Sequence, residues 1–339
     1  MRIRVLGAGI IGLFCADELL RRGHDVTVVD PQPASGASYA AAGMLAPSAE
    51  VWHGEEALLD LGLRSLALWP DAAARLGVPL QTSGTLLVAA DRGDLQQVER
   101  QCALLAAHGR EVTVLDRAAV RRQEPSLGPA VVGGASLADD PSVDPRAVLA
   151  ALLARVPVVA QEPPNDLAPY DLTVVATGAR LPEPFTALVR GVRGEIVRAR
   201  GGAGPSRTVR GWVHGEPVYV VPRASCELVI GATSEEHDGE PAPTVGGVLR
   251  LLRAARELLP GLEQAEITEV TARDRPGTAD NLPLVGPSGV DGVLLAAGHF
   301  RHGVLLAPLT ARIVADHVET GSVETALDPR RLTRERSLQ

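Results

Sequence analysis

The chain has 339 residues, enough for two lobes, because a single hydrophobic core usually stops growing at about 250–300 residues. Its formal net charge of -8 disfavours nucleic acid or an anionic membrane surface as a partner, since an acidic protein repels both on average. The sequence contains no lysine, which excludes a lysine Schiff base and a P-loop lysine.

The three cysteines, Cys15, Cys102 and Cys226, are isolated in sequence, which indicates a reducing compartment and gives no disulfide or zinc spacing. The apolar N-terminal stretch is broken by glycines and by Asp17, so it is typical of neither a signal peptide nor a membrane span. These features predict a folded protein in the cytoplasm.

A dinucleotide-binding unit is predicted at the start of the chain. An apolar strand at 2–6 leads into GAGIIG, a helical pattern follows until Gly23, and a second strand covers 25–30. In this fingerprint the first glycine (Gly7) makes a tight turn, the second (Gly9) lets a pyrophosphate approach, and the third (Gly12) allows close helix packing. Asp30 is the expected ribose ligand. The fingerprint does not distinguish FAD from NAD.

Small residues fill the segment SYAAAGMLA at 38–46. Its backbone can lie against a flat ring and its amides can meet a phosphate or a flavin edge, but a simple packing turn explains it equally well.

The rest of the chain predicts further strands of the nucleotide lobe and a second lobe. Apolar runs at 171–176, before Thr177 and Gly178, and at 292–297, before Gly298, are typical of buried parallel strands, whereas 84–90 and 216–232 resemble antiparallel ones. Helices are expected at 94–108 and 248–259, with an exposed loop at 199–208. We predict an FAD-binding domain formed by 1–50, 138–181 and 288–339, and a substrate-binding domain formed by 51–137 and 182–287.

Near the C-terminus, AGHFRHGVLL precedes a helical pattern that reaches about Val318. The positive start of that helix can stabilise the negative charge of a reduced flavin. An ordinary capped helix with a solvated Arg301 is the alternative. His299 and His302 have helical spacing, but no complete ligand pattern surrounds them, and no metal is predicted.

Taken together, the segments GAGIIG, SYAAAGMLAPSAE, VYVVPR with ELVIGAT, DRPGT with DNLPLVG, and AAGHFRHGVLLAP resemble the glycine oxidases of the D-amino-acid oxidase superfamily, which also includes sarcosine oxidases. The resemblance covers nearly the whole chain. It implies an α/β fold with a discontinuous, glutathione-reductase-like Rossmann domain that binds FAD noncovalently, and a second domain built on an antiparallel sheet.

The resemblance also implies site residues. Arg275 pairs with the substrate carboxylate, Tyr219 donates a hydrogen bond to it, and Arg301 assists; the planar fork of arginine suits this task. The expected cofactor contacts are Gly7, Gly9, Ile10, Ile11, Gly12, Asp30, Ser38, Ala41, Ala42, Gly43, Met44, Leu45, Thr177, Gly178, Gly298, His299, Phe300, Arg301, His302, Gly303, Val304 and Leu305.

Three departures from the family pattern concern the substrate and the outer layer of the nucleotide lobe. Ser234 follows GAT where some relatives have methionine, His302 replaces a frequent asparagine, and the connection 156–172 is short. The resemblance therefore leaves the substrate open between glycine and a larger N-substituted glycine.

The implied reaction is oxidative deamination of glycine with molecular oxygen, giving glyoxylate, ammonia and hydrogen peroxide, with a role in thiamine biosynthesis. The alternative within the family is an oxidase of sarcosine or an N-carboxymethyl amino acid, which releases glyoxylate and an amine in a specialised biosynthetic pathway. A nicotinamide dehydrogenase and a flavin-binding protein without turnover are the competing classes. The oligomeric state, including a homo-oligomer, stays open.

Overall fold

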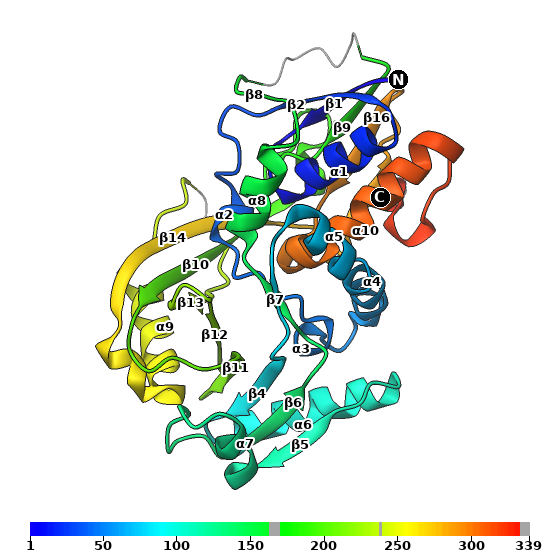
Figure 1. The fold of residues 1–339 in the computed structure, drawn as a ribbon. Helices are drawn as coiled ribbons and strands as arrows, with labels where there is room; N and C mark the ends of the chain where they lie inside the picture. The colour runs from blue at the N-terminus through cyan, green and yellow to red at the C-terminus, as the bar shows by residue number, and fades with distance from the viewer. Residues whose placement is uncertain (163–169, 237–238, 333–339) are drawn as a thin grey trace.

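The computed structural model describes residues 1–162, 170–236 and 239–332. Their two large sheets meet along the middle of the molecule (Figure 1). The segments 163–169, 237–238 and 333–339 lie outside the described residues, so the predicted short connection 156–172 is described only in part.

The first sheet has six strands in the order β15-β16-β9-β1-β2-β8, and all neighbours are parallel except β15 with β16. Its strands are apolar because both faces are covered. On one face, α1, α8 and α10 pack in a core that includes Phe14, Leu149 and Val314. The elements are β1 (Arg2–Leu6), α1 (Ile10–Arg21), β2 (Asp25–Val29), α8 (Pro145–Leu153), β8 (Val158–Val159), β9 (Leu172–Val175), β15 (Leu284–Pro287), β16 (Val293–Ala297) and α10 (Gly303–Thr320).

The second sheet has eight strands in the order β14-β10-β13-β12-β11-β4-β6-β5. Each pair is antiparallel except β4 with β11, which is parallel. The strands are β4 (Thr85–Ala89), β5 (Thr113–Asp116), β6 (Gly133–Leu137), β10 (Arg190–Arg200), β11 (Thr208–Val213), β12 (Glu216–Pro222), β13 (Glu227–Gly231) and β14 (Glu266–Gly277).

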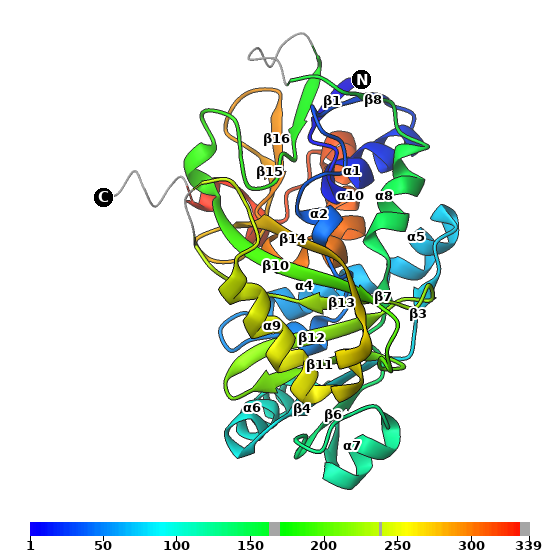
Figure 2. The ribbon, with the colours of Figure 1, turned by 90° about the vertical axis from the view of Figure 1, so that its left-hand side faces the viewer.

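Side chains along the strands of this sheet point alternately to its two faces, and only one of these faces is turned towards the other lobe. Helix α9 (Val245–Leu258) covers one face, as Figure 2 shows. Val197 and Val220 belong to the hydrophobic cluster between this helix and the sheet. Their neighbours Ile196 and Val221 point to the opposite face and contact Ala42, because successive side chains of a strand alternate. The second face is therefore turned towards the small-residue segment of the first lobe.

The remaining elements are α2 (Ala37–Ala40), α3 (Pro47–Glu50), α4 (Glu56–Leu66), α5 (Trp69–Leu76), α6 (Arg92–Ala107) and α7 (Arg117–Gln123), the two-stranded sheet of β3 (Leu80–Gln81) and β7 (Ser142–Val143), and 3-10 turns at Thr186–Leu188, Pro260–Gln264, Phe300–His302 and Thr325–Leu327. Among the described helices, none combines the length and the apolar character that crossing a bilayer requires.

The predicted α/β architecture with a second sheet is confirmed, with two local corrections. Ala199 and Arg200 continue β10, and Thr208 begins β11, because they pair with neighbouring strands, so the predicted loop shrinks to 201–207. The strand predicted at 84–90 pairs in parallel with β11 as well as antiparallel with β6. The predicted domain boundaries stay a prediction; β15, inside the segment 182–287, pairs with the first sheet.

Candidate active site

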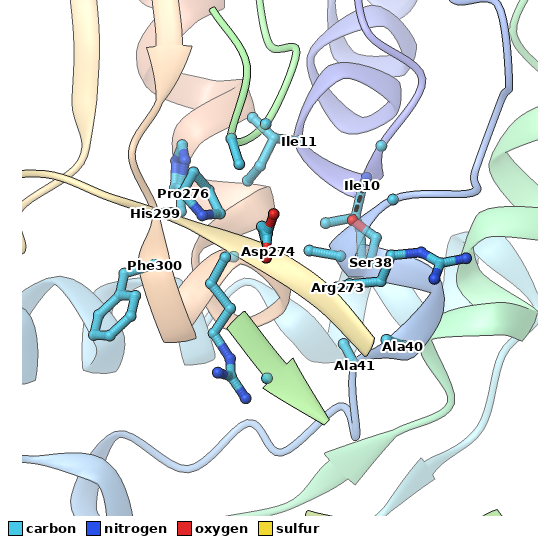
Figure 3. A pocket seen from close by; sticks show the side chains of 18 of the residues that line it. Ile10, Ile11, Ser38, Ala40, Ala41, Arg273, Asp274, Pro276, His299 and Phe300 are labelled. Atoms are coloured by element: carbon cyan, nitrogen blue, oxygen red, sulfur yellow. Dashed lines mark hydrogen bonds between the residues drawn. The ribbon is translucent and has the colours of Figure 1, made fainter. Parts of the chain in front are cut away.

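One cavity of about 990 Å³ runs between the two sheets. Residues that are far apart in sequence line it, from the start of α1 and the segment 34–44 to strands β10, β12 and β14 and the turn before α10. In Figure 3, Ile10 and Ser38 lie at one side of this cavity and Phe300 lies at the other.

The start of α1 is shaped by glycines. Gly7 has a φ of 102°, and a Cβ there would lie 2.3 Å from the carbonyl oxygen of Ala176 on the neighbouring strand. A Cβ at Gly12 would lie 2.0 Å from the Gly7 carbonyl oxygen. At Gly9 the nearest atom would be Ser38 Oγ at 3.5 Å, so the absent side chain leaves open space beside the helix start.

This helix start has the chemistry of an anion site. Gly9, its N-cap, provides no side-chain hydrogen bond, and the first turn carries no acidic residue. The Ile10 amide donates to Ser38 Oγ at 3.0 Å, as the dashed line in Figure 3 shows. The dipole and the free amide groups of a helix start favour a phosphate, and this end fits the pyrophosphate of a dinucleotide.

Asp30 ties the glycine loop to the end of β2. Its carboxylate accepts hydrogen bonds from the Ala8 amide at 2.6 Å and the Gln32 amide at 2.8 Å. Arg273, near Ser38 in Figure 3, donates to the carbonyl oxygens of Ser35 and Ala272. A carboxylate and a guanidinium therefore line the end of the cavity where ribose and phosphate would lie.

The small-residue segment is held from outside the cavity. Gly43 has a φ of 71°, and a Cβ there would lie 2.0 Å from the Val143 carbonyl oxygen. Arg223 donates to the carbonyl oxygen of Ala42. Burial lowers the pKa of the Arg223 guanidinium to about 10. Ala41, Ala42 and Gly43 thus present backbone to the cavity with few side-chain atoms.

Arg275 and Tyr219 lie side by side in the part of the cavity that strands β12 and β14 line. Arg275 donates from Nη1 to the Thr233 carbonyl oxygen at 3.1 Å, interacts with the Tyr219 side chain, and has no ion-pair partner among the described residues. Burial lowers the pKa of Arg275, and Tyr219 opposes that shift. A half-buried guanidinium that lines a cavity and forms no ion pair with a carboxylate is suited to bind an anionic group.

Tyr219 owes its position to a glycine on the adjacent strand. A Cβ at Gly231 would lie 2.4 Å from the Tyr219 hydroxyl oxygen, so only glycine leaves room for the ring. Burial raises the pKa of Tyr219, while the charge of Arg275 opposes the shift. The phenol therefore keeps its proton at neutral pH and can donate it in a hydrogen bond.

Arg301, in contrast, already has a carboxylate partner. Its Nη2 lies 3.0 Å from Oε2 of Glu55, whose Oε1 accepts from Asn281 at 2.7 Å. The guanidinium also faces the rings of Phe300 and Trp52, at 4.9 and 5.7 Å from the ring centroids. Arg301 is therefore fixed, and its charge is compensated from behind the cavity wall.

A second compensated arginine lies nearby. Arg210 Nη1 donates to Glu50 Oε1 at 3.1 Å, and both residues line the cavity. His302 Nδ1 lies 3.6 Å from Glu50 Oε2. Burial lowers the pKa of His302 and brings the pKa of His299 to about 3, so both imidazoles are neutral at physiological pH. His299 Nε2 lies 2.8 Å from the Thr310 hydroxyl.

Comparison with known proteins identifies the family. Residues 2–317 match the family model described as FAD dependent oxidoreductase. The chain belongs to this family. A flavin therefore replaces the nicotinamide alternative that the glycine fingerprint had left open.

Three relatives show how far the likeness to other members of the family extends. The putative thiamine biosynthesis oxidoreductase ThiO of Rhizobium etli is 36% identical, with 94% of this chain and 97% of that protein covered. The bifunctional protein ThiO/ThiG of Trichormus variabilis is 32% identical over 96% of this chain. The matched region spans only 53% of that longer protein. The crystal structure of glycine oxidase from Geobacillus kaustophilus has a TM-score of 0.85 at 30% identity, with 96% of both chains covered.

The structure of this FAD-dependent oxidoreductase brings most of the predicted residues to the cavity. The three predicted substrate residues line it, as do Gly7, Gly9, Ile10, Ile11, Asp30, Ser38, Ala41, Ala42, Gly43, Met44, Thr177, Gly178, His299, Phe300, Gly303 and Val304. Five predicted cofactor residues do not line it: Gly12, Leu45, Gly298, His302 and Leu305.

These five residues support the wall from behind. Leu45 and Leu305 belong to the hydrophobic core, and the Leu305 carbonyl accepts hydrogen bonds from Ser65 and Trp69. Gly12 and Gly298 allow close packing, since a Cβ at Gly298 would lie 2.4 Å from Thr278 Cγ2. His302 is buried against Glu50. The position of a residue within a motif does not tell whether its side chain lines the cavity or packs behind the lining residues.

Sequence reasoning missed several lining residues, above all Glu50, Trp52, Gly194, Arg210 and Arg273. Glu50 is the last residue of the motif SYAAAGMLAPSAE. Arg273 lies two positions before Arg275 on β14, and residues two positions apart on a strand lie on the same face. That period of two was the available signal for Arg273. Trp52, Gly194 and Arg210 carry no local signal, because only the pairing of distant segments brings them to the cavity.

Proposed function

We propose that this chain binds FAD noncovalently and oxidises glycine to glyoxylate and ammonia, with molecular oxygen as the electron acceptor. The observation that carries the substrate assignment is the half-buried Arg275 guanidinium, which lines the cavity, lies beside the neutral Tyr219 hydroxyl and forms no ion pair with a carboxylate among the described residues. Relatives named glycine oxidase and ThiO support the assignment.

The cavity divides into two ends that suit the two molecules. The start of α1, Asp30 and Arg273 would hold the adenosine diphosphate half of the cofactor, and the bare backbone at 41–44 would lie against the flavin ring. FAD, when bound, supplies a hydride acceptor and the site where oxygen is reduced to hydrogen peroxide. The family resemblance places no histidine or cysteine at a usual point of covalent flavin attachment. We therefore infer noncovalent binding.

The chain's own residues would orient the substrate. Arg275 would take the carboxylate with its planar fork, Tyr219 would donate to the same group, and these two contacts would fix the α carbon beside the 41–44 segment. No protein base is required if the amine enters unprotonated, which agrees with the pKa of His299, because burial lowers it to about 3 and makes this imidazole a weak base. Glycine, oxygen and water then yield glyoxylate, ammonia and hydrogen peroxide.

Sarcosine is the second candidate substrate. The rings of Trp52 and Phe300 line the cavity near Arg301 and offer apolar surface to an N-methyl group. We infer a role in thiamine biosynthesis from relatives named for that pathway, with the imine of glycine as the compound supplied.

A direct assay tests the proposal. The purified protein should be yellow, release its flavin into the supernatant on acid precipitation, and produce hydrogen peroxide and glyoxylate in equal amounts from glycine. Flavin that stays with the precipitate would refute noncovalent binding. A yellow protein that forms no peroxide with glycine, sarcosine or D-alanine would refute the oxidase and leave the flavin-binding alternative.

A further inference from the structure

Among the described residues at the substrate end of the cavity, Arg275 is a guanidinium without an ion pair. Arg210 is paired with Glu50 at 3.1 Å and Arg301 with Glu55 at 3.0 Å, whereas Arg275 hydrogen-bonds to neutral groups and is attracted by the charge of Glu50 only at longer range. Asp274, which also lines the cavity, is paired with Arg193 at 2.9 Å. One carboxylate of a substrate would balance this set.

Glu55 holds Arg301 from outside the cavity. Arg301 lines the cavity, but Glu55 does not, and the side chain of Glu55 is only 16% exposed. Asn281 fixes the second carboxylate oxygen at 2.7 Å, so Glu55 cannot turn away without losing a further hydrogen bond. The positive charge on the cavity wall is thus offset by the half-buried negative charge of Glu55, which does not line the cavity.

We propose that Glu55 is a specificity-determining residue that, by neutralising Arg301, restricts the site to substrates with a single carboxylate. This inference rests on the proposed function and narrows its substrate class to glycine and N-alkyl glycines, against N-carboxymethyl amino acids. A second carboxylate would meet a compensated arginine and the negative charges of Glu50 and Glu55 in a partly desolvated place. The second carboxylate would lose its hydration without gaining a free countercharge.

Two ligands that differ by one charge test the proposal. Thiodiacetate, in which sulfur replaces the amine nitrogen of iminodiacetate, carries two carboxylates, and its monoamide has nearly the same shape with only one. Dissociation constants are measured at pH 8 on the FAD-loaded protein from ligand-induced changes in flavin absorbance. The native protein should bind the monoamide at least about tenfold more tightly, because like charges placed together cost one or more factors of ten in affinity.

Two variants should shift this ratio in opposite directions. Glu55→Gln frees the charge of Arg301 while keeping the shape, so the preference for the monoamide should fall at least about fivefold. Arg301→Gln leaves Glu55 uncompensated, so the preference should grow. Glu56→Gln is the matched control, because it removes the same charge one residue further along and the Glu56 carboxylate accepts its hydrogen bond from Gly54 instead.

The outcomes are separable from those of the oxidase assay. Equal or tighter binding of thiodiacetate by the native protein would overturn the proposal, and so would a Glu55→Gln ratio no different from that of Glu56→Gln. A ratio that falls in Arg301→Gln would also overturn it, and this variant decides the matter if Glu55→Gln loses flavin or melts early. Absence of peroxide from glycine would reject the oxidase but would leave the charge comparison intact.

Discussion

The guanidinium of Arg275 lies in the space that a side chain at position 194 would occupy. A Cβ built on Gly194 of β10 would lie 2.3 Å from Cζ, Nη1 and Nη2 of Arg275 on the paired strand β14. A glycine on one strand therefore sets where the cation of the neighbouring strand can lie, in the same way that Gly231 sets the place of Tyr219.

Gly194→Ala should impair glycine binding without unfolding the protein. The methyl group would push the flexible end of Arg275 aside, and misplacement of a charge-assisted contact should lower kcat/KM by at least about tenfold. Steady-state peroxide assays give this value, and flavin content and melting temperature should stay close to native. Gly246→Ala is the control, because a Cβ there meets nothing within 4 Å. Unchanged kinetics in Gly194→Ala would contradict the assigned place of Arg275.

Arg275→Ala should lower kcat/KM for glycine at least roughly tenfold, because a charge-assisted hydrogen bond contributes about 1.5–3 kcal/mol. Arg275→Lys should recover only part of the loss, since an ammonium does not reproduce the planar fork. Arg301→Ala should have a smaller effect, because Glu55 already compensates that charge. Arg256→Ala, at an exposed surface pair, is the control. If Arg301→Ala abolishes activity while Arg275→Ala retains it, the two assignments must be exchanged.

Asp30→Ala should weaken FAD retention, which is measured as flavin per chain after gel filtration. The variant loses the expected ribose contact and also the acceptor of the Ala8 and Gln32 amides that shapes the glycine loop. Asp30→Asn keeps one acceptor oxygen and should retain more flavin than Asp30→Ala. Asp25→Ala, at the exposed start of the same strand, should retain the native amount. Full retention by Asp30→Ala would show that the carboxylate is not needed.

His214 should make the stability of the second lobe depend on pH. Its imidazole lies 2.9 Å from Asp91 and 3.0 Å from Glu257, and the hydrogen bond to Asp91, followed by the charge of Glu257, raises its pKa. A raised folded-state pKa means that the stabilisation is complete below the unfolded value of about 6.5 and is lost as pH rises through the folded value.

The melting temperature of the native protein should therefore exceed that of His214→Asn by more at pH 5.5 than at pH 9. Asparagine is the suitable replacement because residue 214 has a φ of 53°, which asparagine tolerates. A difference between the two proteins that stays constant across this range would show that the imidazole charge makes no contribution.

The sequence by itself determined the dinucleotide-binding half, and its resemblance to a known family named candidate site residues. A strand, GAGIIG, a helix and a strand ending in Asp30 form a continuous stretch, so local spacing fixes their geometry. The resemblance carried by DRPGT and VYVVPR pointed to Arg275 and Tyr219, and the structure places both at the cavity.

Only the tertiary structure decided which charges remain free. Glu55 and Arg301 are 246 residues apart, and Glu50 and Arg210 are 160 residues apart, so no local sequence pattern predicts either ion pair. Likewise, Gly194 and Gly231 read as ordinary strand glycines until strand pairing brings Arg275 and Tyr219 over them. Electrostatic compensation and steric room depend on distance in space, which strand register and packing set, whereas a linear motif records only distance along the chain.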